Sequence, residues 1–319
     1  MKYRGIFTAI FLLVLSSCSS DLDLIDPADP IPVVFFQMNP EDRFLYLTLT
    51  KSFAGDSSAY DMARNPQSVY YDSANIYLEG WIDQYKVWET HFEPSSRIKA
   101  PGIFAEVPGY CYKAYNIEPF GQLFTHYRLM VTIPGISSPV FSKIGNVGPP
   151  IVKSRFDHQI SLYPKNYEIG ISPGPGSAYC DLICVFRYQQ LEGMWVNHSD
   201  TFLLRRDINF EAGRTDYLYA ELFFNQIAVN IKPINDTIVR KFTSLDLILY
   251  AGDQYFRDYI DTYGNAADLD LPPKGNITNG LGLFTMLRTA IKDNMTLDRV
   301  THDSLCLGQF TKKLGFVRW

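Results

Sequence analysis

Short runs of alternating apolar and polar residues dominate this chain and limit it to a β-sheet fold. Residues 44–50 read Phe-Leu-Tyr-Leu-Thr-Leu-Thr, and residues 74–78, 86–92 and 127–132 alternate in the same way. Because successive side chains of a strand point to opposite faces, this pattern is typical of strands with one buried face. Tyr and Phe, which strands favour, make up 43 of the 319 residues.

The first half of the chain is expected to form an antiparallel sandwich. Turn residues separate the alternating runs, as in Asn-Pro-Glu-Asp at 39–42, and no convincing amphipathic helix occurs among them. Short strands divided by turns are typical of immunoglobulin-like sandwiches. We therefore predict an Ig-like antiparallel β-sandwich over residues 31–134.

Two clusters of Pro and Gly follow this half. They lie at 134–139 and 148–150, and such clusters mark either a linker or a strand that crosses between sheets. The sequence therefore predicts a linker or crossover over residues 135–150 and a second domain over residues 151–319.

The second domain is expected to be antiparallel and β-rich, with one short helix. Residues 178–188 and 217–231 are expected as long strands. Asp253 follows a strand-like run and is a good helix N-cap, and Gly264 is a good helix end. The sequence therefore predicts a single helix between them.

The first seventeen residues have the order of an export signal. Lys2 and Arg4 give a positive start, residues 6–15 form an apolar run, and two serines follow. The apolar run is about half of the roughly 20 residues that span a bilayer. A cleaved lipoprotein signal peptide is therefore expected over residues 1–17 instead of a permanent transmembrane helix.

Cys18 follows this signal. The string Leu-Ser-Ser-Cys at 15–18 resembles the lipobox of bacterial lipoproteins, in which the Cys is acylated, for example with palmitate, and becomes the mature N-terminus. Several acyl chains on one residue give stable membrane anchoring. The alternative is an ordinary secretory signal that contains a Cys. We expect lipidation of Cys18.

An acidic tether is expected over residues 18–30. Ser-Ser-Asp-Leu-Asp at 19–23 resembles the Ser-plus-acid export tag of surface lipoproteins in the Bacteroidota. The alternative is a solvated tether with no address function, for which acidic and Pro-containing sequence is normal. The resemblance implies a lipid-anchored outer-membrane protein exposed at the cell surface.

The charge of the chain argues against nucleic-acid partners. Of the 29 Lys and Arg residues, two lie in the signal, which leaves 27 against 34 Asp and Glu, a net charge of −7. No basic cluster stands out along the sequence. Nucleic acid, or an anionic membrane face, is therefore a poor match for the partner.

Four cysteines remain after Cys18: Cys111, Cys180, Cys184 and Cys306. An exported protein could join them in two disulfides, with three connectivities. On one strand, Cys180 and Cys184 would lie about 13 Å apart, beyond disulfide reach. A Cys111–Cys306 bond and buried free thiols both stay open.

The string Asn-Ile-Thr-Asn-Gly-Leu-Gly-Leu-Phe at 276–284 is the most distinctive in the mature chain. It resembles the near-terminal motif of the Bacteroidota lipoproteins grouped as domain-of-unknown-function family 4249. The Tyr-Leu-Thr-Leu-Thr run, the Tyr-Arg-Leu-Met-Val-Thr-Ile-Pro run at 127–134, and the strand and Tyr-rich helix at 245–263 occur in the same order as in that family. The stretched approach at 121–127 and the Pro-, Gly- and Tyr-rich residues 95–120 depart from it.

That resemblance implies an accessory protein. Members of the family look like outer-membrane lipoproteins encoded beside TonB-dependent transporters, which implies capture or delivery of a nutrient, and no catalytic residues carry over. The string also has a structural interpretation, because Gly280 and Gly282 can adopt backbone angles that other residues avoid.

Residues for catalysis or metal binding do not stand out. The five histidines are scattered, and none forms the i, i+4 pair of a helical zinc site. The chain has no Gly-x-Ser-x-Gly elbow and no phosphate-binding loop. His198 and Asp200 could share a strand face, but no carboxylate pair is nominated. We expect no enzyme activity and no cofactor.

Aromatic residues are the better candidates for ligand binding. Trp81 and Trp88 flank or occupy a strand, and Tyr110, Tyr112 and Tyr115 lie in a segment bounded by Gly and Pro. Their rings could provide flat apolar platforms with polar edges for a sugar or a peptide. The alternative is that they pack in the core or cover a sheet.

The sequence thus predicts a mainly β outer-membrane lipoprotein. The expected function is that of a non-catalytic, ligand-binding partner of a TonB-dependent transporter, with an unknown nutrient or glycan as the ligand. The main alternative is a surface adhesin that binds protein or glycan. A weaker alternative is a hydrolase, which would need two acids about 5–9 Å apart in a cleft.

Overall fold

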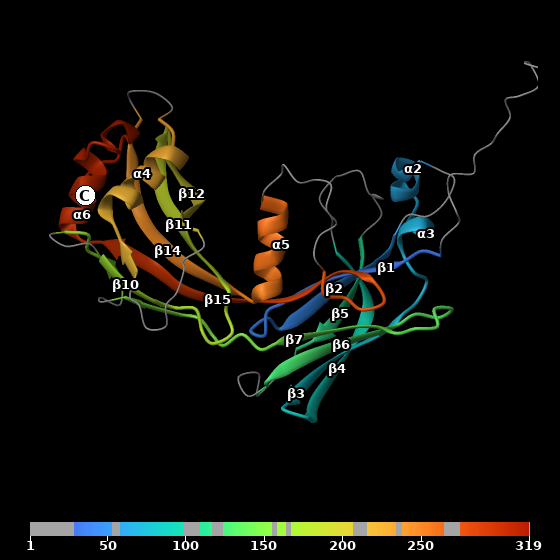
Figure 1. Cartoon of the computed structure of the whole chain (residues 1–319). Coiled ribbons are helices and arrows are strands. Elements are labelled where there is room, and N and C mark those ends of the chain that lie inside the picture. The colour runs from blue at the N-terminus through green and yellow to red at the C-terminus, as the bar shows by residue number, and fades with distance from the viewer. Residues whose placement is uncertain are drawn as a thin grey trace, which may run out of the picture.

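The computed structural model describes residues 29–52, 58–97, 109–116, 124–154, 158–163, 167–206, 216–233, 238–264 and 275–318. The predicted signal peptide, Cys18 and nearly all of the acidic tether lie outside the described residues. The chain forms two lobes set at an angle, with one helix standing between them (Figure 1). Strands make up 53% of the described residues and helices 18%, which confirms the mainly β class.

The first lobe, called the N-lobe, consists of seven strands and two short helices. The strands are β1 (Pro32–Met38), β2 (Phe44–Lys51), β3 (Asn75–Ile82), β4 (Tyr85–Arg97), β5 (Gly109–Tyr115), β6 (His126–Thr132) and β7 (Val140–Gly145); the helices are α2 (Ala59–Arg64) and α3 (Pro66–Val69). The helices are too short to leave a periodic pattern in the sequence. β7 falls inside the predicted linker or crossover, where Val140, Ser142 and Ile144 alternate as buried residues of an edge strand.

The second lobe, called the C-lobe, contains the remaining elements. The strands are β8 (Ile151–Ser154), β9 (Gln159–Ile160), β10 (Tyr167–Ser172), β11 (Tyr179–Glu192), β12 (Met194–Arg205), β13 (Asp216–Leu218), β14 (Arg240–Gly252) and β15 (Leu281–Leu297). The helices are α4 (Ala220–Asn230), α5 (Gln254–Gly264), α6 (Arg299–Leu307) and a 3-10 turn (Lys312–Leu314). None of the described helices is long and apolar enough to cross a membrane.

One continuous path of paired strands runs through both lobes, in the order β12-β11-β14-β15-β1-β2-β5-β4-β3-β6-β7. β15 joins the lobes, because its first half pairs with β1 in parallel and its second half pairs with β14 antiparallel. β8, β10 and β13 form a separate small sheet. A single 17-residue strand therefore takes part in the strand pairing of both halves of the molecule.

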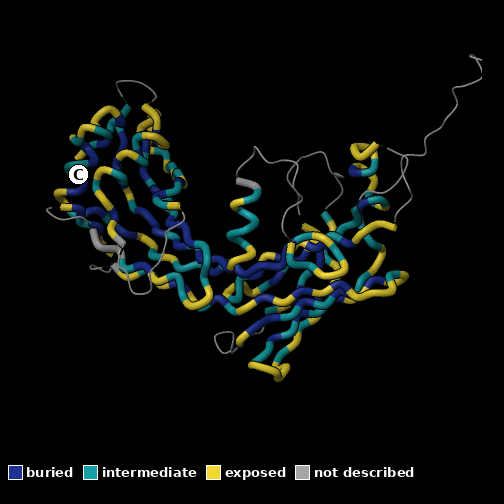
Figure 2. Tube along the Cα trace, viewed as in Figure 1, coloured by how far each residue is buried: buried dark blue, intermediate teal, exposed yellow. Residues whose placement is uncertain are grey.

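The N-lobe is sandwich-like because β4 belongs to two sheet layers. Its first part pairs with β3 and its last five residues pair with β5, so the layers fold over one another. Phe36 lies between them, stacked on Phe284 at 5.1 Å and edge-on to Phe92 at 5.4 Å. Buried residues fill the interior of this lobe in Figure 2.

The C-lobe has its own core, in which helices cover one face of the sheet. Alternate residues of β11 and β14 point into this core, and Phe223, Phe224 and Ile227 of α4 pack against them. Residues 217–231 were expected as a strand, and that expectation is wrong beyond β13. Phe223, Ile227 and Ile231 recur every four residues, so a helix buries all of them on one side.

The C-lobe contains three helices in the described residues where one was expected. The predicted helix is confirmed as α5, and Asp253 caps it through a 2.8 Å hydrogen bond from the Phe256 backbone N–H. α6 begins after Asp298, whose side chain accepts from the Thr301 N–H at 2.8 Å. This cap was not predicted from the sequence.

The four described cysteines are buried thiols, and no disulfide joins them. Cys180 and Cys184 both point into the C-lobe core from β11, while Cys111 lies in the N-lobe and Cys306 on α6. Of the two alternatives left open by the sequence, the structure has buried thiols.

Candidate functional site

A cavity of about 370 Å³ opens in the N-lobe beside the start of β5; we call it the tyrosine pocket. Its walls come from β2, α3, the segment after α3, β4 and β5. The lining residues are Leu49, Pro66, Gln67, Tyr70, Tyr71, Asp72, Pro94, Ser95, Tyr110, Cys111 and Tyr112. Four tyrosines therefore face one small space.

Capping of α3 places two of these tyrosines. Pro66 occupies the first turn, and the Asn65 side chain accepts a hydrogen bond from the Gln67 N–H at 3.1 Å. The helix ends after one turn, where the Tyr70 N–H donates to the Pro66 carbonyl at 2.8 Å. Buried Val69 anchors the turn, so the chain leaves it over the start of β5.

Neighbouring groups orient the tyrosines of the pocket. Tyr70 lies edge-on to Tyr110, with ring centroids 5.2 Å apart and planes at 79°. The Tyr71 hydroxyl donates to the Pro30 carbonyl at 3.2 Å, and the Lys51 ammonium lies 5.1 Å from its ring centroid. Tyr112 is buried in the N-lobe core, while Tyr110 keeps half of its surface exposed. The pocket thus has a packed floor and an accessible ring at its rim.

Three tyrosines and the cysteine of the pocket stay neutral at physiological pH. Burial raises the pKa of the Tyr70, Tyr71 and Tyr112 hydroxyls and of the Cys111 thiol. Each hydroxyl can therefore both donate and accept a hydrogen bond. Asp72 is the only carboxylate among the lining residues. The site offers neutral polar groups and apolar ring faces to a ligand.

The five aromatic residues proposed from sequence do not lie together. Tyr110 and Tyr112 line the tyrosine pocket, and the other three lie elsewhere. Trp88 is half-buried and lies 6.1 Å from the ring of Phe124, against the N-lobe core. It therefore packs as part of the sandwich.

Trp81 and Tyr115 lie on outer faces of the N-lobe. Trp81 is stacked on His126 at 5.8 Å, and the Arg128 guanidinium lies 4.0 Å from its ring centroid. Tyr115 is exposed at the end of β5 away from the pocket and lies 4.7 Å from Phe44. His126 and the Arg128 guanidinium already cover the Trp81 ring, so it offers no open platform.

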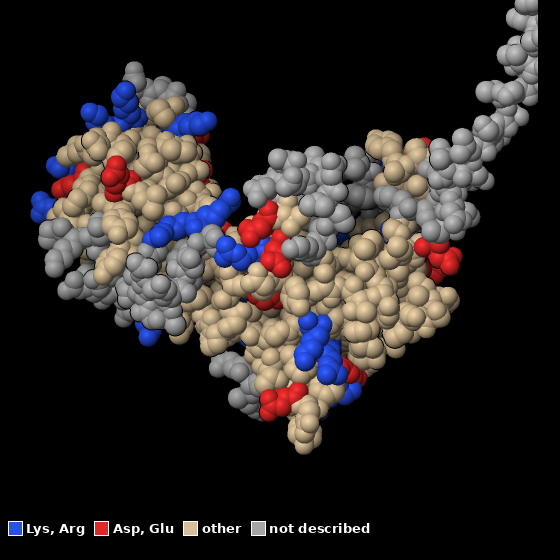
Figure 3. Space-filling view, in the orientation of Figure 1, with Lys and Arg blue, Asp and Glu red and all other residues tan. Residues whose placement is uncertain are grey.

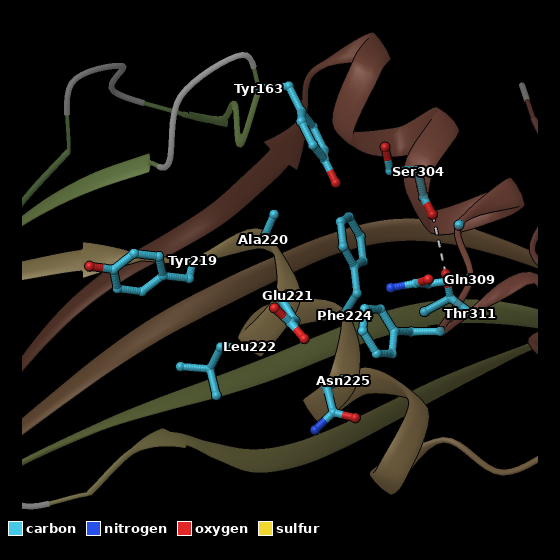
Figure 4. A pocket seen from close by; sticks show the side chains of 12 residues that line it. Tyr163, Tyr219, Ala220, Glu221, Leu222, Phe224, Asn225, Ser304, Gln309 and Thr311 are labelled. Carbon is cyan, nitrogen blue, oxygen red and sulfur yellow. Dashed lines mark hydrogen bonds between the residues drawn. The ribbon is translucent and has the colours of Figure 1, made fainter.

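A larger cavity of about 890 Å³ lies in the C-lobe between the start of α4 and the end of α6. Its lining residues are Tyr163, Tyr219, Ala220, Glu221, Leu222, Phe224, Asn225, Ser304, Gly308, Gln309, Phe310 and Thr311. Figure 4 shows Tyr163 pointing toward Phe224, whereas Tyr219 and Leu222 point away from it. Two of its larger lining side chains therefore turn out of this cavity.

His198 and Asp200 share a face of β12, as the sequence allowed, but each binds a different partner. The Tyr188 hydroxyl donates to Asp200 at 2.9 Å, and burial together with this bond raises the pKa of Tyr188 to about 12. His198 lies 2.9 Å from a Glu192 oxygen. Among the described residues no cluster of three or more His, Cys, Asp or Glu side chains has the arrangement of a metal site.

The 276–284 string closes the N-lobe. The Asn276 side chain donates to the Phe284 carbonyl at 2.7 Å and accepts from the Phe284 N–H at 2.8 Å. Thr278 exchanges two backbone hydrogen bonds with Phe141 of β7. Gly282 has a φ of +109°, and a Cβ there would lie 1.9 Å from the Val34 carbonyl oxygen. These contacts give the string a structural role.

Sequence reasoning missed Tyr70 and Tyr71. The signal for them was the Asn-Pro pair at 65 and 66, which starts a helix. The two tyrosines come directly after the single turn of that helix. No protein-family model matches this chain, and no curated protein matches it. The function must therefore be argued from the pocket and from the sequence motifs.

Proposed function

We propose that this chain is a lipid-anchored outer-membrane protein that binds a small neutral sugar in the tyrosine pocket. In this proposal it acts without catalysis, as a partner of a TonB-dependent transporter. The observation that carries the ligand proposal is the convergence of Tyr70, Tyr71, Tyr110 and Tyr112 on one cavity.

The pocket favours a sugar because it combines apolar ring faces with neutral hydrogen-bonding groups. A pyranose ring has one apolar face of C–H groups and a rim of hydroxyls. The exposed Tyr110 ring suits the former, and the neutral tyrosine hydroxyls with Gln67 and Ser95 suit the latter. The volume of about 370 Å³ is near the lower end of small-molecule sites, which suits one or two rings.

The same features disfavour charged ligands. Asp72 is the only Asp, Glu, Lys or Arg among the described lining residues, so a phosphate or carboxylate would meet a cation only outside this lining, at Lys51 beside Tyr71. A cationic ligand would have one carboxylate at the rim and no second charge to enclose it. Neutral ligands therefore lose the least hydration on entry.

A glycan array separates these classes. The mature chain is labelled and applied to immobilised neutral mono- and disaccharides, acidic sugars and dipeptides. We expect retention on a subset of neutral sugars. Retention on dipeptides alone would replace the sugar proposal with a peptide-binding one, and retention on acidic sugars alone would contradict the pocket as the site.

The anchor and the partner rest on sequence motifs. The lipobox at Cys18 and the Ser-plus-acid tag support anchoring at the outer membrane, and the 276–284 resemblance supports a transporter partner. Metabolic labelling with an alkynyl palmitate should mark the parent chain and not a Cys18→Ser variant.

A pull-down tests the transporter. The tagged chain is purified from detergent-solubilised outer membranes, and the proteins that follow it are identified by mass spectrometry. A stoichiometric TonB-dependent barrel supports the uptake role. Its absence, with the chain still accessible to protease on intact cells, would favour the adhesin alternative.

A further inference from the structure

The β11–β12 hairpin ends in an exposed apolar tip. The chain turns at Gly193, which has a φ of +78°, and the Met194 side chain beyond it is 71% exposed. Leu191 and Trp195, which face each other across the hairpin, are 42% and 37% exposed. Single exposed apolar residues are ordinary, whereas three neighbouring ones form a patch of the kind that marks an interaction site.

β11 runs from the junction with the N-lobe to the opposite pole of the C-lobe. The apolar tip lies at that opposite pole. β11 begins opposite Gly252, which lies two residues before the junction helix α5, and ends at the hairpin turn. The Leu191 N–H donates to the Val239 carbonyl at 3.0 Å, which brings the start of β14 to the same pole.

Buried Arg240 gathers further segments at this pole. Its guanidinium donates to the carbonyls of Lys232 at 3.0 Å and Leu314 at 2.8 Å. The segment after α4 and the 3-10 turn therefore meet beside the hairpin. Val229, near the end of α4, is 60% exposed and adds to the apolar surface.

Four lysines lie on the segments that meet at this pole, although they are distant in sequence. The Lys241 ammonium lies 4.2 Å from the ring centroid of Trp195. Lys232 is exposed beside the Arg240 contact, and Lys312 and Lys313 are exposed in the 3-10 turn. Figure 3 shows Lys and Arg side chains along the upper edge of this lobe.

Acidic groups near the tip are already bonded to neighbours. Glu192 accepts from Gln190 at 2.5 Å and lies 2.9 Å from His198, and Asp200 accepts from Tyr188. Among the described residues of this pole, one arginine and four lysines therefore face these two carboxylates, so the described charge here is positive although the mature chain as a whole is negative.

We propose that this pole docks on the surface of an anionic phospholipid bilayer. Leu191, Met194 and Trp195 enter the interface, and the four lysines face the lipid phosphates. Trp is favoured at membrane–water interfaces, and lysines are attracted to anionic leaflets. A neutral bilayer would satisfy the apolar tip and leave the lysines without partners. This docking is independent of the tyrosine pocket.

Trp195 reports the docking directly. The full chain is reconstituted with phosphatidylcholine vesicles that carry brominated acyl chains, with or without an admixture of phosphatidylglycerol. Quenching by bromine is measured for the parent chain and for Trp195→Phe, and the difference isolates Trp195. We expect quenching with phosphatidylglycerol at low salt and its loss at high salt. Equal quenching in both kinds of vesicle, or none in either, would overturn the proposal.

Matched variants separate the charge from the apolar tip. Each lysine near an anionic surface favours docking about fivefold, so Lys232→Gln with Lys313→Gln should lower the ratio of docked to undocked chain about 25-fold. Lys143→Gln with Lys153→Gln, which changes exposed lysines elsewhere, should leave it unchanged. Met194→Asp should abolish the Trp195 quenching, while Val87→Asp on the N-lobe should not.

A spin label gives a readout that does not depend on Trp195. Met194→Cys places an exposed thiol at the tip, while the four described native cysteines are buried. Label depth in the bilayer that rises with phosphatidylglycerol content supports docking. A label that stays in water, with the thermal unfolding of the variant unchanged, would contradict it and favour a protein partner for this pole.

Discussion

Asn276 and Phe284 are joined by two hydrogen bonds that close the loop before β15. The amide of Asn276 pairs with both backbone groups of Phe284, at 2.7 and 2.8 Å, as a neighbouring strand would. Phe284 in turn stacks on Phe36 at the centre of the N-lobe core. A polar side chain outside the strand thus fixes the position of the strand that joins both lobes.

Replacing Asn276 should therefore destabilise the whole chain. Asn276→Ala leaves the Phe284 N–H and carbonyl without their partners in a buried setting, which costs about 1–3 kcal/mol of unfolding free energy. Urea unfolding followed by circular dichroism measures it. Asn197→Ala, which removes an exposed side-chain hydrogen bond to Gln189, is the control and should change the free energy by less than about 0.5 kcal/mol. Equal effects would contradict the clamp.

Gly282 and Gly135 form a second matched pair. Both have a positive φ, +109° and +85°, so an added Cβ strains either backbone. At Gly135 nothing lies within 4 Å of that Cβ, whereas at Gly282 the Val34 carbonyl oxygen lies at 1.9 Å. Gly135→Ala should cost about 1–2 kcal/mol. Gly282→Ala should cost clearly more, because β15 must move away from β1.

Two buried aspartates should change stability with pH in opposite directions. A bidentate ion pair with Arg187 lowers the pKa of Asp246, whereas burial raises the pKa of Asp253 despite its hydrogen bonds from Thr285 and Met286. The contribution of Asp246 is present above its unfolded pKa and is lost in acid. The contribution of Asp253 is present below its unfolded pKa and is lost as pH rises through the folded value.

Unfolding free energies between acidic and neutral pH test these signs. The advantage of the parent chain over Asp246→Asn should grow as pH rises, and its advantage over Asp253→Asn should shrink. Because the unfolding free energy of each variant is subtracted from that of the parent at the same pH, the contributions of the other carboxylates cancel. If both free-energy differences changed with pH in the same direction, the environments assigned to the two aspartates would be contradicted.

The buried thiols should resist modification. Burial raises the pKa of Cys306 to about 11 and also raises that of Cys111 and Cys184. Iodoacetamide at neutral pH should therefore label none of the four described cysteines until a denaturant is added. Mass spectrometry counts the labels. A reductant should leave the midpoint of thermal unfolding unchanged, and a large drop would point to a disulfide.

The sequence was sufficient for the fold class and for local elements with strong signals. Period-2 alternation predicted strands such as β2, β3 and β6, and Asp253 with Gly264 predicted α5. Residues 217–231 were misread because Tyr, Leu, Phe and Ile suit both strand and helix. Only the four-residue recurrence of Phe223, Ile227 and Ile231 distinguishes them, and packing on the sheet decides it.

The pocket and the basic pole could not be found from local pattern alone. Tyr70 and Tyr110 are forty residues apart, and their contact exists only because α3 ends over the start of β5. Lys232 and Lys313 lie at the same pole because Arg240, from a third element, binds the carbonyls of Lys232 and of Leu314, the residue after Lys313. A linear scan for charge runs detects neither arrangement.

The most direct test of the ligand proposal is a calorimetric titration of the mature chain with the neutral sugar that the array selects. The parent chain and Tyr85→Ala, an exposed tyrosine at the β3–β4 turn, should bind it equally. Tyr110→Ala should bind it about tenfold more weakly, because the ring face at the rim is lost. Equal affinity in all three, or no binding by the folded parent, would contradict the tyrosine pocket as the ligand site.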